Sequence, residues 1–340
     1  MESVTNRSTT SWLAWLGHVV SRGAWSWLSW AWRLVLRVVT GRSALERLLA
    51  ATRDNQGGEE AEARLREVVR ELERGWRDAA ERVRQHAAGW SLLEDDHGVL
   101  DDLLSSETEA VVSRFAGGGD GLVAARGYDA VKDGLRYIGV RAALDEAVVA
   151  LKVPYDRTDA EHEDKLFALW DALRPGLDRP ERISPKWGML GFQGRDPATD
   201  FRGMGLLALE QLLFVAQSSG TGYLAVLACA EACDEEPFYP FATAGINFTA
   251  FALAALRRGD LDGALMAAAA AVGAHQWTLD AAMEVFHAFY ARALLALHAQ
   301  WRAEMPEDIM AFPGVSERVQ AAMVARVRLG DLNELLCPGL

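Results

Sequence analysis

Residues 191–205, GFQGRDPATDFRGMG, combine side chains that can bind an anion with a backbone that can turn sharply. Arg195 and Arg202 carry guanidinium groups, whose planar fork of N–H donors suits carboxylate and phosphate oxygens. Asp196 and Pro197 are typical of a helix start, because aspartate accepts from free helix amides and proline needs no N–H there. The glycines that frame these residues tolerate turns and close approach, and they are Gly191, Gly194, Gly203 and Gly205.

The residues after Gly205 predict a rigid support for this loop. LLALEQLLFVAQ is apolar on all sides, which is typical of a buried helix, and a polar loop held on a rigid element is a common way to present functional side chains. Thr199 and Asp200 offer a second capping position. Two interpretations are open: Arg202 acts on an external ligand, or it pairs with Asp196 or Asp200 and only locks the loop.

The chain from about residue 128 onward has an almost continuous helical pattern. No segment alternates between apolar and polar residues with the period of two that a strand requires. Turn-rich segments interrupt the pattern at residues 152–159, 174–188, 191–205, 234–240, 257–263 and 303–308. We therefore expect an all-α, multi-helix domain.

The first 42 residues hold six of the twelve tryptophans, and five arginines against one glutamate. Their longest charge-free run, residues 8–21, is shorter than the ~18–20 residues that a spanning helix needs. Apolar and polar side chains recur at helical spacing, and tryptophan and arginine both favour a bilayer interface. The pattern predicts an amphipathic helix lying on a membrane, with interface contacts from Trp12, Trp15, Trp25, Trp32, Arg33 and Arg37.

Two other interpretations of this segment stay open. Its tryptophans could pack against the protein's own core, or its acid-poor, Arg- and Ser-containing composition could serve as a mitochondrial-type targeting segment. The chain as a whole is acidic, with a net charge of −13, which argues against nucleic-acid binding because such proteins present a basic face. The basic end favours an anionic surface such as lipid.

Composition divides the chain into three regions. Residues 60–86 predict a solvated surface helix with one apolar stripe and opposite faces rich in Glu and Arg. The expected organisation is an amphipathic membrane-interface or docking helix at 1–42, a charged helical region at 43–140 and the multi-helix domain at 141–325.

The cysteines and histidines form no metal or catalytic pattern. Cys229 and Cys233 lie four residues apart in an apolar helical run, and with the distant Cys337 they predict buried thiols in a reducing compartment. The seven histidines lack paired metal spacing, and no Gly-x-Ser-x-Gly nucleophile elbow is present. We therefore expect no metal and no self-contained enzyme.

A longer motif surrounds the two arginines: Trp187, Gly191-Phe192-Gln193-Gly194, Asp196-Pro197, Thr199-Asp200-Phe201-Arg202-Gly203 and Gly205. It resembles the signature of the ELMO (engulfment and cell motility) domain, in the form found in short, stand-alone ELMOD-type proteins. The resemblance extends to PYDRTDAEHEDKLFALWDALRP upstream, to FATAGINFTAFAL and MEVFHAFYARALLALHAQW downstream, and to WRLVLRVVTGRSALERLL near the start. It is weakest at residues 50–140.

The resemblance implies a GTPase-activating protein for Arf or Arf-like small GTPases. It assigns the activity to Arg202, which would enter the partner's GTP site as an arginine finger. GTP hydrolysis spreads negative charge over the transferring phosphoryl group, and a guanidinium supplied by a second protein neutralises that charge. Mg²⁺ and nucleotide belong to the GTPase, so the activator needs no cofactor and is not itself a complete enzyme.

We expect the rest of the motif to support Arg202. Gln193, Asp196, Thr199 and Asp200 would position the loop, with Gln193 either tying the backbone or placing the attacking water. The expected scaffold around them consists of Trp187, Gly191, Phe192, Gly194, Pro197, Phe201, Gly203 and Gly205.

A second function stays open, because larger ELMO-type proteins resemble the same motif and act as scaffolds. Such a protein would link a small-GTPase exchange factor to membrane or cytoskeleton without catalysis. The ten prolines and the lack of a proline-rich tail favour the activator. The expected location is cytoplasmic and peripheral on an intracellular membrane, with a GTP-bound Arf-like protein as partner.

Overall fold

The computed structural model describes residues 78–79, 81–85, 102–103, 105–107, 121–273 and 276–328. In the helix that begins at Gly121, the side chains are described from residue 132 onward. Every regular element among these residues is helical and none is a strand, which confirms the all-α fold class. The predicted amphipathic helix at 1–42, with all of its interface residues, lies outside the described residues.

The chain forms two compact units. The described residues up to Ala143 and those within Met266–Trp277 belong to the first unit, and Leu144–Leu265 with the described residues from Thr278 onward belong to the second. In the first unit, the Arg82 guanidinium donates to both carboxylate oxygens of Glu107, at 2.7 and 2.6 Å. The second unit carries the signature.

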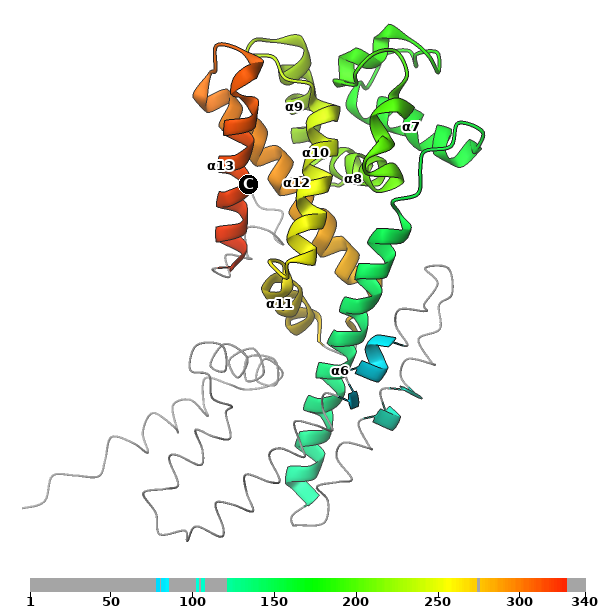
Figure 1. Ribbon diagram of the computed structural model, residues 1–340, viewed down its shortest axis with the longest axis vertical. Coiled ribbons are helices and arrows are strands. Elements are labelled where there is room, and N and C mark those ends of the chain that lie inside the picture. Colours follow the sequence, from blue (N-terminus) through cyan, green and yellow to red (C-terminus); the bar gives the residue numbers. More distant parts are fainter. Residues whose placement is uncertain are drawn as a thin grey trace, which may run out of the picture. The chain divides into compact units, whose positions relative to one another are not determined.

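From residue 121 onward the described elements follow one another as labelled in Figure 1. The α-helices are α6 (Gly121–Ala150), α7 (Ala160–Leu173), α8 (Gly205–Gln217), α9 (Gly222–Asp234), α10 (Phe241–Arg257), α11 (Asp262–Val272), α12 (Leu279–Glu304) and α13 (Phe312–Arg328). Three short 3₁₀ helices lie between them: η2 (Pro185–Leu190), η3 (Pro197–Arg202) and η5 (Ile309–Ala311).

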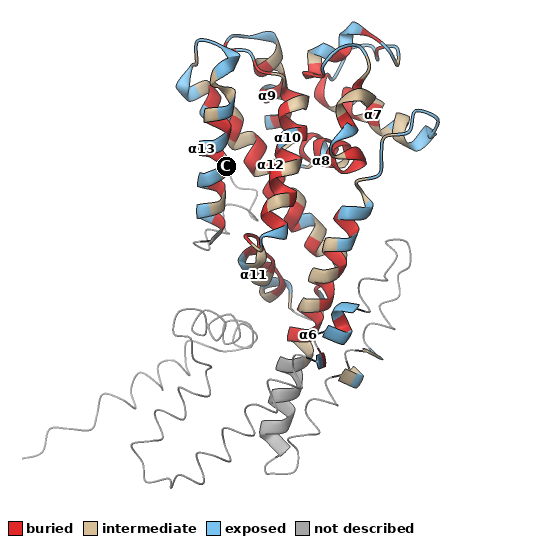
Figure 2. Ribbon diagram, viewed as in Figure 1, coloured by how far each residue is buried: buried red, intermediate tan, exposed pale blue. Residues whose placement is uncertain are grey.

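Helix α8 lies at the centre of the second unit. It contacts α7, α9, α10, α12 and η3, and most of its residues on every side are buried (Figure 2). This confirms the buried helix that LLALEQLLFVAQ predicts. Helices α10 and α12 pack against each other as well as against α8, and α13 covers α12.

Local signals set several of the helix boundaries in this unit. The Asp159 carboxylate accepts from the N–H of Glu161 at 2.9 Å and caps α7. The Thr278 hydroxyl accepts from the N–H of Ala281 at 3.2 Å and caps α12. Each of these oxygens satisfies one of the amides that a helix N-terminus leaves free.

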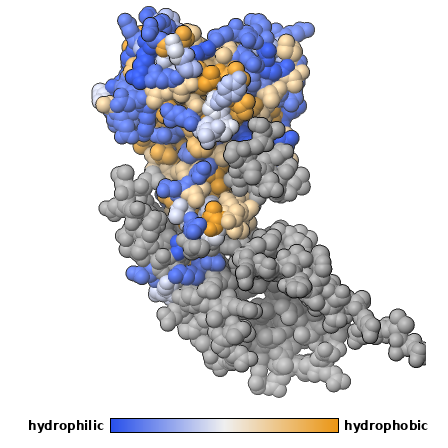
Figure 3. All heavy atoms as spheres, turned by 180° about the vertical axis from the view of Figure 1, so that it is seen from behind, coloured by the Kyte–Doolittle hydropathy of each residue, from blue (hydrophilic) through white to orange (hydrophobic). Residues whose placement is uncertain are grey.

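The described surface mixes hydrophilic side chains with small hydrophobic patches, as one side of the molecule shows in Figure 3. No single helix among the described residues is long and apolar enough to cross a membrane. Helices α8 and α9 pass that test only as a pair, and they are bent by 109° where they meet.

Candidate functional site

The first glycine of the signature lies against the start of α10. Gly191 ends η2 with a φ of +83°, and a Cβ added there would lie 2.2 Å from the backbone nitrogen of Phe241. Its carbonyl oxygen accepts from the N–H of Thr243 at 3.2 Å and from the Thr243 hydroxyl at 2.8 Å. Only glycine suits a left-handed turn that approaches another backbone this closely, so Gly191 joins the signature to α10.

The last glycine makes a similar close approach at the start of α8. Gly205 has a φ of +58°, and an added Cβ would lie 2.1 Å from the carbonyl oxygen of Val153. The N–H groups of Leu206 and Leu207 donate to the carbonyls of Val153 and Leu151, at 3.0 and 2.7 Å. These bonds satisfy free amides at the helix start and hold α8 to the segment that precedes α7.

The two inner glycines differ from the outer ones. Gly194 has a φ of +76° but no atom within 4 Å of an added Cβ, so only its backbone conformation favours glycine. Gly203 has a φ of −84° and equally open surroundings. Nothing in the described geometry requires glycine at position 203.

Asp196 and Pro197 begin a helix, and that helix is the short η3 rather than the long α8. The Asp196 carboxylate accepts from the N–H of Ala198 at 3.1 Å, and the Thr199 hydroxyl donates to the Asp196 carbonyl at 2.8 Å. Pro197 is buried at the first helical position. Because η3 stops at Arg202 and α8 starts at the left-handed Gly205, the signature contains a helical turn of its own.

A row of aromatic rings lies beneath the signature. Trp187 meets Phe192 edge to face, Phe192 meets Phe201 in the same way, and Phe201 stacks on Tyr155, with ring centroids 6.1, 5.6 and 5.6 Å apart. Trp187 and Phe201 are fully buried. Because such ring pairs add to the free energy of burial, Phe201 anchors the backbone directly before Arg202.

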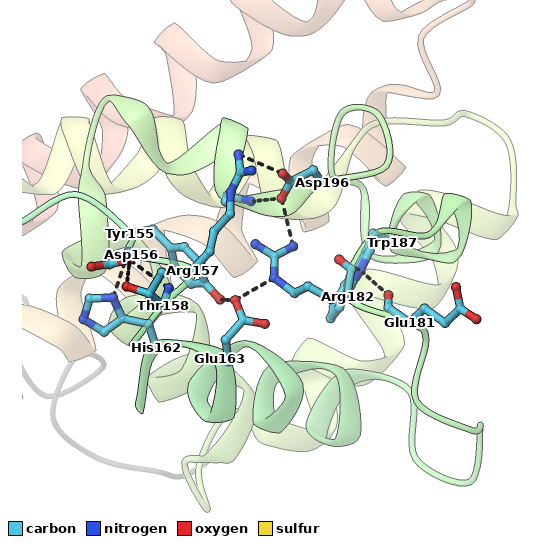
Figure 4. Close-up of polar contacts among 11 residues, drawn as sticks. Tyr155, Asp156, Arg157, Thr158, His162, Glu163, Glu181, Arg182, Trp187 and Asp196 are labelled. Carbon is cyan, nitrogen blue, oxygen red and sulfur yellow. Dashed lines mark hydrogen bonds and ion pairs between the residues drawn. The ribbon is translucent and has the colours of Figure 1, made fainter. Parts of the chain in front are cut away.

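One arginine that the sequence analysis did not single out ties η3 to α7 (Figure 4). The Arg182 Nε donates to Glu163 at 2.6 Å and its Nη1 donates to Asp196 at 2.8 Å. Its guanidinium carbon lies 5.4 Å from the centre of the Tyr155 ring, whose hydroxyl donates to the same Glu163 at 2.5 Å. Burial, together with this bond to a carboxylate, raises the pKa of Tyr155.

Asp196 is therefore occupied by cations other than Arg202. Besides Arg182, the exposed Arg157 forms an ion pair with Asp196 at 3.0 Å. No sequence motif marks Arg157 or Arg182, since both stand in turn-rich segments with several other charges. The nineteen-residue separation between Glu163 and Arg182 exceeds any helical spacing, so only the fold brings them together.

Asp200 closes the signature onto itself. Its Oδ2 accepts from the backbone N–H of Gln193 at 2.7 Å. Burial raises the pKa of the Asp200 carboxyl, and the hydrogen bond from Gln193 and the positive charge of Arg202 oppose that rise. Gln193 thus ties the loop through its backbone, while its side chain is exposed.

Arg202 is the last residue of η3, and its side chain is exposed. Within the part of the chain that the structure describes, its guanidinium has no hydrogen bond and no ion pair. Burial raises the pKa of Asp200 and the positive charge of Arg202 opposes that rise through space, but the Arg202 guanidinium forms no ion pair with Asp200 or Asp196. A guanidinium that is free in solvent, on a backbone held from several sides, can meet an anion on another molecule.

Side chains of metal-ligating types and thiols also occur among the described residues. Among them, no group of three or more His, Cys, Asp or Glu side chains could hold a metal ion. Cys229 and Cys233 are free thiols on α9, one buried and one half-buried. The exposed Arg202 and the loop that presents it form the candidate functional site.

Comparison with known proteins places this loop within a region that is similar to a known family. The family model described as the ELMO/CED-12 family matches residues 147–316. Over 102 residues the chain is 46% identical to ELMO domain-containing protein B of Dictyostelium discoideum, covering 30% of this chain and 35% of that protein. No solved structure matches the chain.

Two mouse proteins are similar over longer stretches. ELMO domain-containing protein 1 is 32% identical over 222 residues, covering 60% of this chain and 64% of that protein. ELMO domain-containing protein 2 is 33% identical over 178 residues, covering 52% and 57% respectively. The chain thus spans less than two thirds of the length of these relatives. Because the family match covers half of the chain and contains the whole signature, the chain belongs to the ELMO/CED-12 family.

Proposed function

We propose that this protein activates GTP hydrolysis by an Arf or Arf-like small GTPase, with Arg202 as the arginine finger. The observation that carries the proposal is the state of Arg202, exposed and without a hydrogen-bond or ion-pair partner among the described residues. Most other charged side chains of the signature, in contrast, are engaged within the fold: Asp196 by Arg182 and Arg157, and Asp200 by Gln193.

The rigidity of the loop supports catalysis as well as binding. A finger must reach the transferring phosphoryl group without a large loss of freedom, because ordering a flexible segment costs free energy on association. Here the backbone of residues 191–205 is held at both outer glycines, at the η3 cap and at the buried Phe201. Binding would therefore have to order little more than the Arg202 side chain itself.

The test is single-turnover GTP hydrolysis by a panel of GTP-loaded Arf and Arf-like proteins, each with and without this protein. An arginine finger accelerates hydrolysis by about 10³–10⁵-fold. Arg202→Lys keeps the charge but loses the planar fork, so it should remove most of the acceleration while the urea-unfolding curve stays the same.

Two results would contradict this assignment. Full acceleration by the Arg202→Lys protein would show that the finger is another residue. Capture of an exchange factor, with no effect on hydrolysis by any protein of the panel, would instead indicate a scaffold of the ELMO type.

A further inference from the structure

The six arginines between residues 144 and 205 fall into two groups. Four of them form ion pairs: Arg157 with Asp196, Arg174 with Asp234, Arg179 with Asp171, and Arg182 with both Glu163 and Asp196. The other two, Arg195 and Arg202, have exposed side chains with no polar partner among the described residues. Both lie within residues 191–205, although only Arg202 is one of the signature residues, and the proposed function uses only Arg202.

The backbone of Arg195 is held as firmly as that of Arg202. Its carbonyl oxygen accepts from the N–H of Ser184 at 2.9 Å. Gly194 before it has a left-handed φ of +76°, and Asp196 after it caps η3 and is held by Arg182. A free guanidinium on a fixed backbone is thus presented at the start of η3 as well as at its end.

An exposed apolar residue directly precedes the backbone partner of Arg195. Ile183 directly precedes Ser184, whose N–H binds the Arg195 carbonyl, and it is 52% exposed. A single exposed apolar residue is ordinary on a protein surface. An exposed isoleucine one residue away from the backbone partner of an unpaired arginine instead suits an interface patch that combines an apolar and a charged side chain.

The backbones of Arg195 and Arg202 lie at opposite ends of η3. Arg195 directly precedes Asp196, the N-cap of η3, whereas Arg202 is the last residue of η3, seven positions later in the chain. If Arg202 occupies the nucleotide site, Arg195 is the arginine of this loop that remains for the protein surface of the partner.

We propose that Arg195 and Ile183 form a recognition patch for the GTP-bound GTPase, in which Arg195 pairs with an acidic side chain of the partner and Ile183 meets an apolar one beside it. This inference rests on the proposed function. The patch acts on association rather than on the hydrolysis step, because charges at the rim of an interface mainly affect the encounter rate and its salt dependence. In a chain of net charge −13, two free cations in one loop also favour an acidic partner.

The experiment measures binding and hydrolysis separately with one responsive GTPase of the panel. Binding is measured with the GTPase loaded with a non-hydrolysable GTP analogue, and hydrolysis is measured under single-turnover conditions over a range of activator concentrations. Arg195→Glu should weaken binding by about five- to tenfold and raise the half-saturating concentration equally. The rate at saturation should stay at the wild-type value. Raising the salt concentration should reduce the difference, since exposed charges are screened.

Arg257→Glu is the matched control. Arg257 is an exposed arginine at the far end of α10, roughly 24 Å from the end that contacts Gly191, given 1.5 Å of rise per residue. The Arg257→Glu substitution changes the net charge by the same amount as Arg195→Glu and should leave binding to the GTPase unaltered. Ile183→Asp should weaken binding to the GTPase by a similar factor to Arg195→Glu. When the acidic residue of the GTPase that pairs with Arg195 is replaced by lysine, the GTPase should bind the Arg195→Glu protein again.

The outcomes separate this inference from the proposed function. If the Arg195→Glu protein binds and half-saturates like the wild type while the Arg202→Lys protein is inactive, the recognition patch is wrong and the assignment of Arg202 as the finger stands. A loss in the saturating rate of Arg195→Glu, with binding unchanged, would also overturn it, since Arg195 would then act on the reaction. Equal losses of binding in the Arg195→Glu and Arg257→Glu proteins would show that only the net charge matters, and would overturn the patch as well. If no GTPase responds to the wild-type protein, the proposed function itself fails, and the patch fails with it.

Discussion

The backbone N–H of Gln193 donates a 2.7 Å hydrogen bond to the carboxylate of Asp200, and this bond joins the two halves of the signature. It acts together with the Asp196 cap and the buried Phe201 on the short segment that ends at Arg202. Loss of any one of these restraints should therefore disturb the position of Arg202 while the helical core persists.

Asp200→Ala tests this restraint directly. The change removes the acceptor of the Gln193 amide, and we expect the free energy of unfolding to fall by about 1 kcal/mol and the stimulated hydrolysis to fall with it. Asp200→Asn retains an acceptor oxygen and removes a carboxylate whose burial raises its pKa, so its loss should be smaller. Urea unfolding and single-turnover hydrolysis measure both effects. Equal losses in the two variants would show that the hydrogen bond does not hold the loop.

The glycines of the signature provide a second test. Gly191→Ala places a Cβ against the backbone of Phe241 at a φ of +83°, so we expect a loss of about 3 kcal/mol or more in the free energy of unfolding. Gly194→Ala has a φ of +76° but open space, and its cost should be only the backbone strain, about 1 kcal/mol. Thermal unfolding compares them, and similar melting temperatures would contradict the close approach at Gly191.

Two arginines five residues apart test the effect of burial on an ion pair. The Arg174 side chain is 7% exposed and binds Asp234 and the Met189 carbonyl, whereas the Arg179 side chain is 57% exposed and binds Asp171. Arg174→Met should lower the free energy of unfolding by about 1.5–3 kcal/mol, because it removes charge-assisted hydrogen bonds from a buried guanidinium, while the 47% exposed Asp234 side chain can return to water. Arg179→Met should change it by less than about 1 kcal/mol. Chemical denaturation gives both values, and a larger effect at Arg179 would refute this ranking.

His287 predicts part of the pH dependence of stability. Burial against Phe214 and its neighbours lowers the pKa of His287 from 6.5 to about 4. Between these values the unfolded chain binds a proton that the folded chain does not, so the free energy of unfolding falls as the pH is lowered. The fall should total about 3 kcal/mol.

Replacement of His287 isolates this contribution. His287→Leu is of similar size and cannot titrate, so its unfolding free energy should lose that part of the pH slope. Urea unfolding of both proteins between about pH 7 and pH 4 measures the difference. Parallel pH profiles for the two proteins would argue against a neutral, buried imidazole.

The tryptophan- and arginine-rich residues 1–42 predict peripheral membrane binding. Flotation with liposomes that contain anionic lipid should carry the full chain, and a chain without these residues should float less. High salt should weaken the association, because the arginines contribute electrostatically. Unchanged flotation after the truncation would favour a helix packed on the protein instead.

The sequence by itself determined the all-α class, the buried α8 and the start of η3. These features depend on residues close together in the chain: the all-round apolar pattern after Gly205, and Asp196 followed by Pro197. Helical periodicity and capping need only a few neighbouring residues, so no knowledge of distant contacts was necessary. The family signature likewise occupies one continuous stretch.

Only the tertiary structure decided which charges are free. In the sequence, Arg182, Arg195 and Arg202 are equivalent cations near the same acids. The fold pairs Arg182 with Glu163, nineteen residues away, and Arg174 with Asp234, sixty residues away, and leaves Arg195 and Arg202 in solvent. Ion pairing depends on the distance between side chains in space, and that distance is set by how α7, η3 and α9 pack, which spacing along the chain does not reveal.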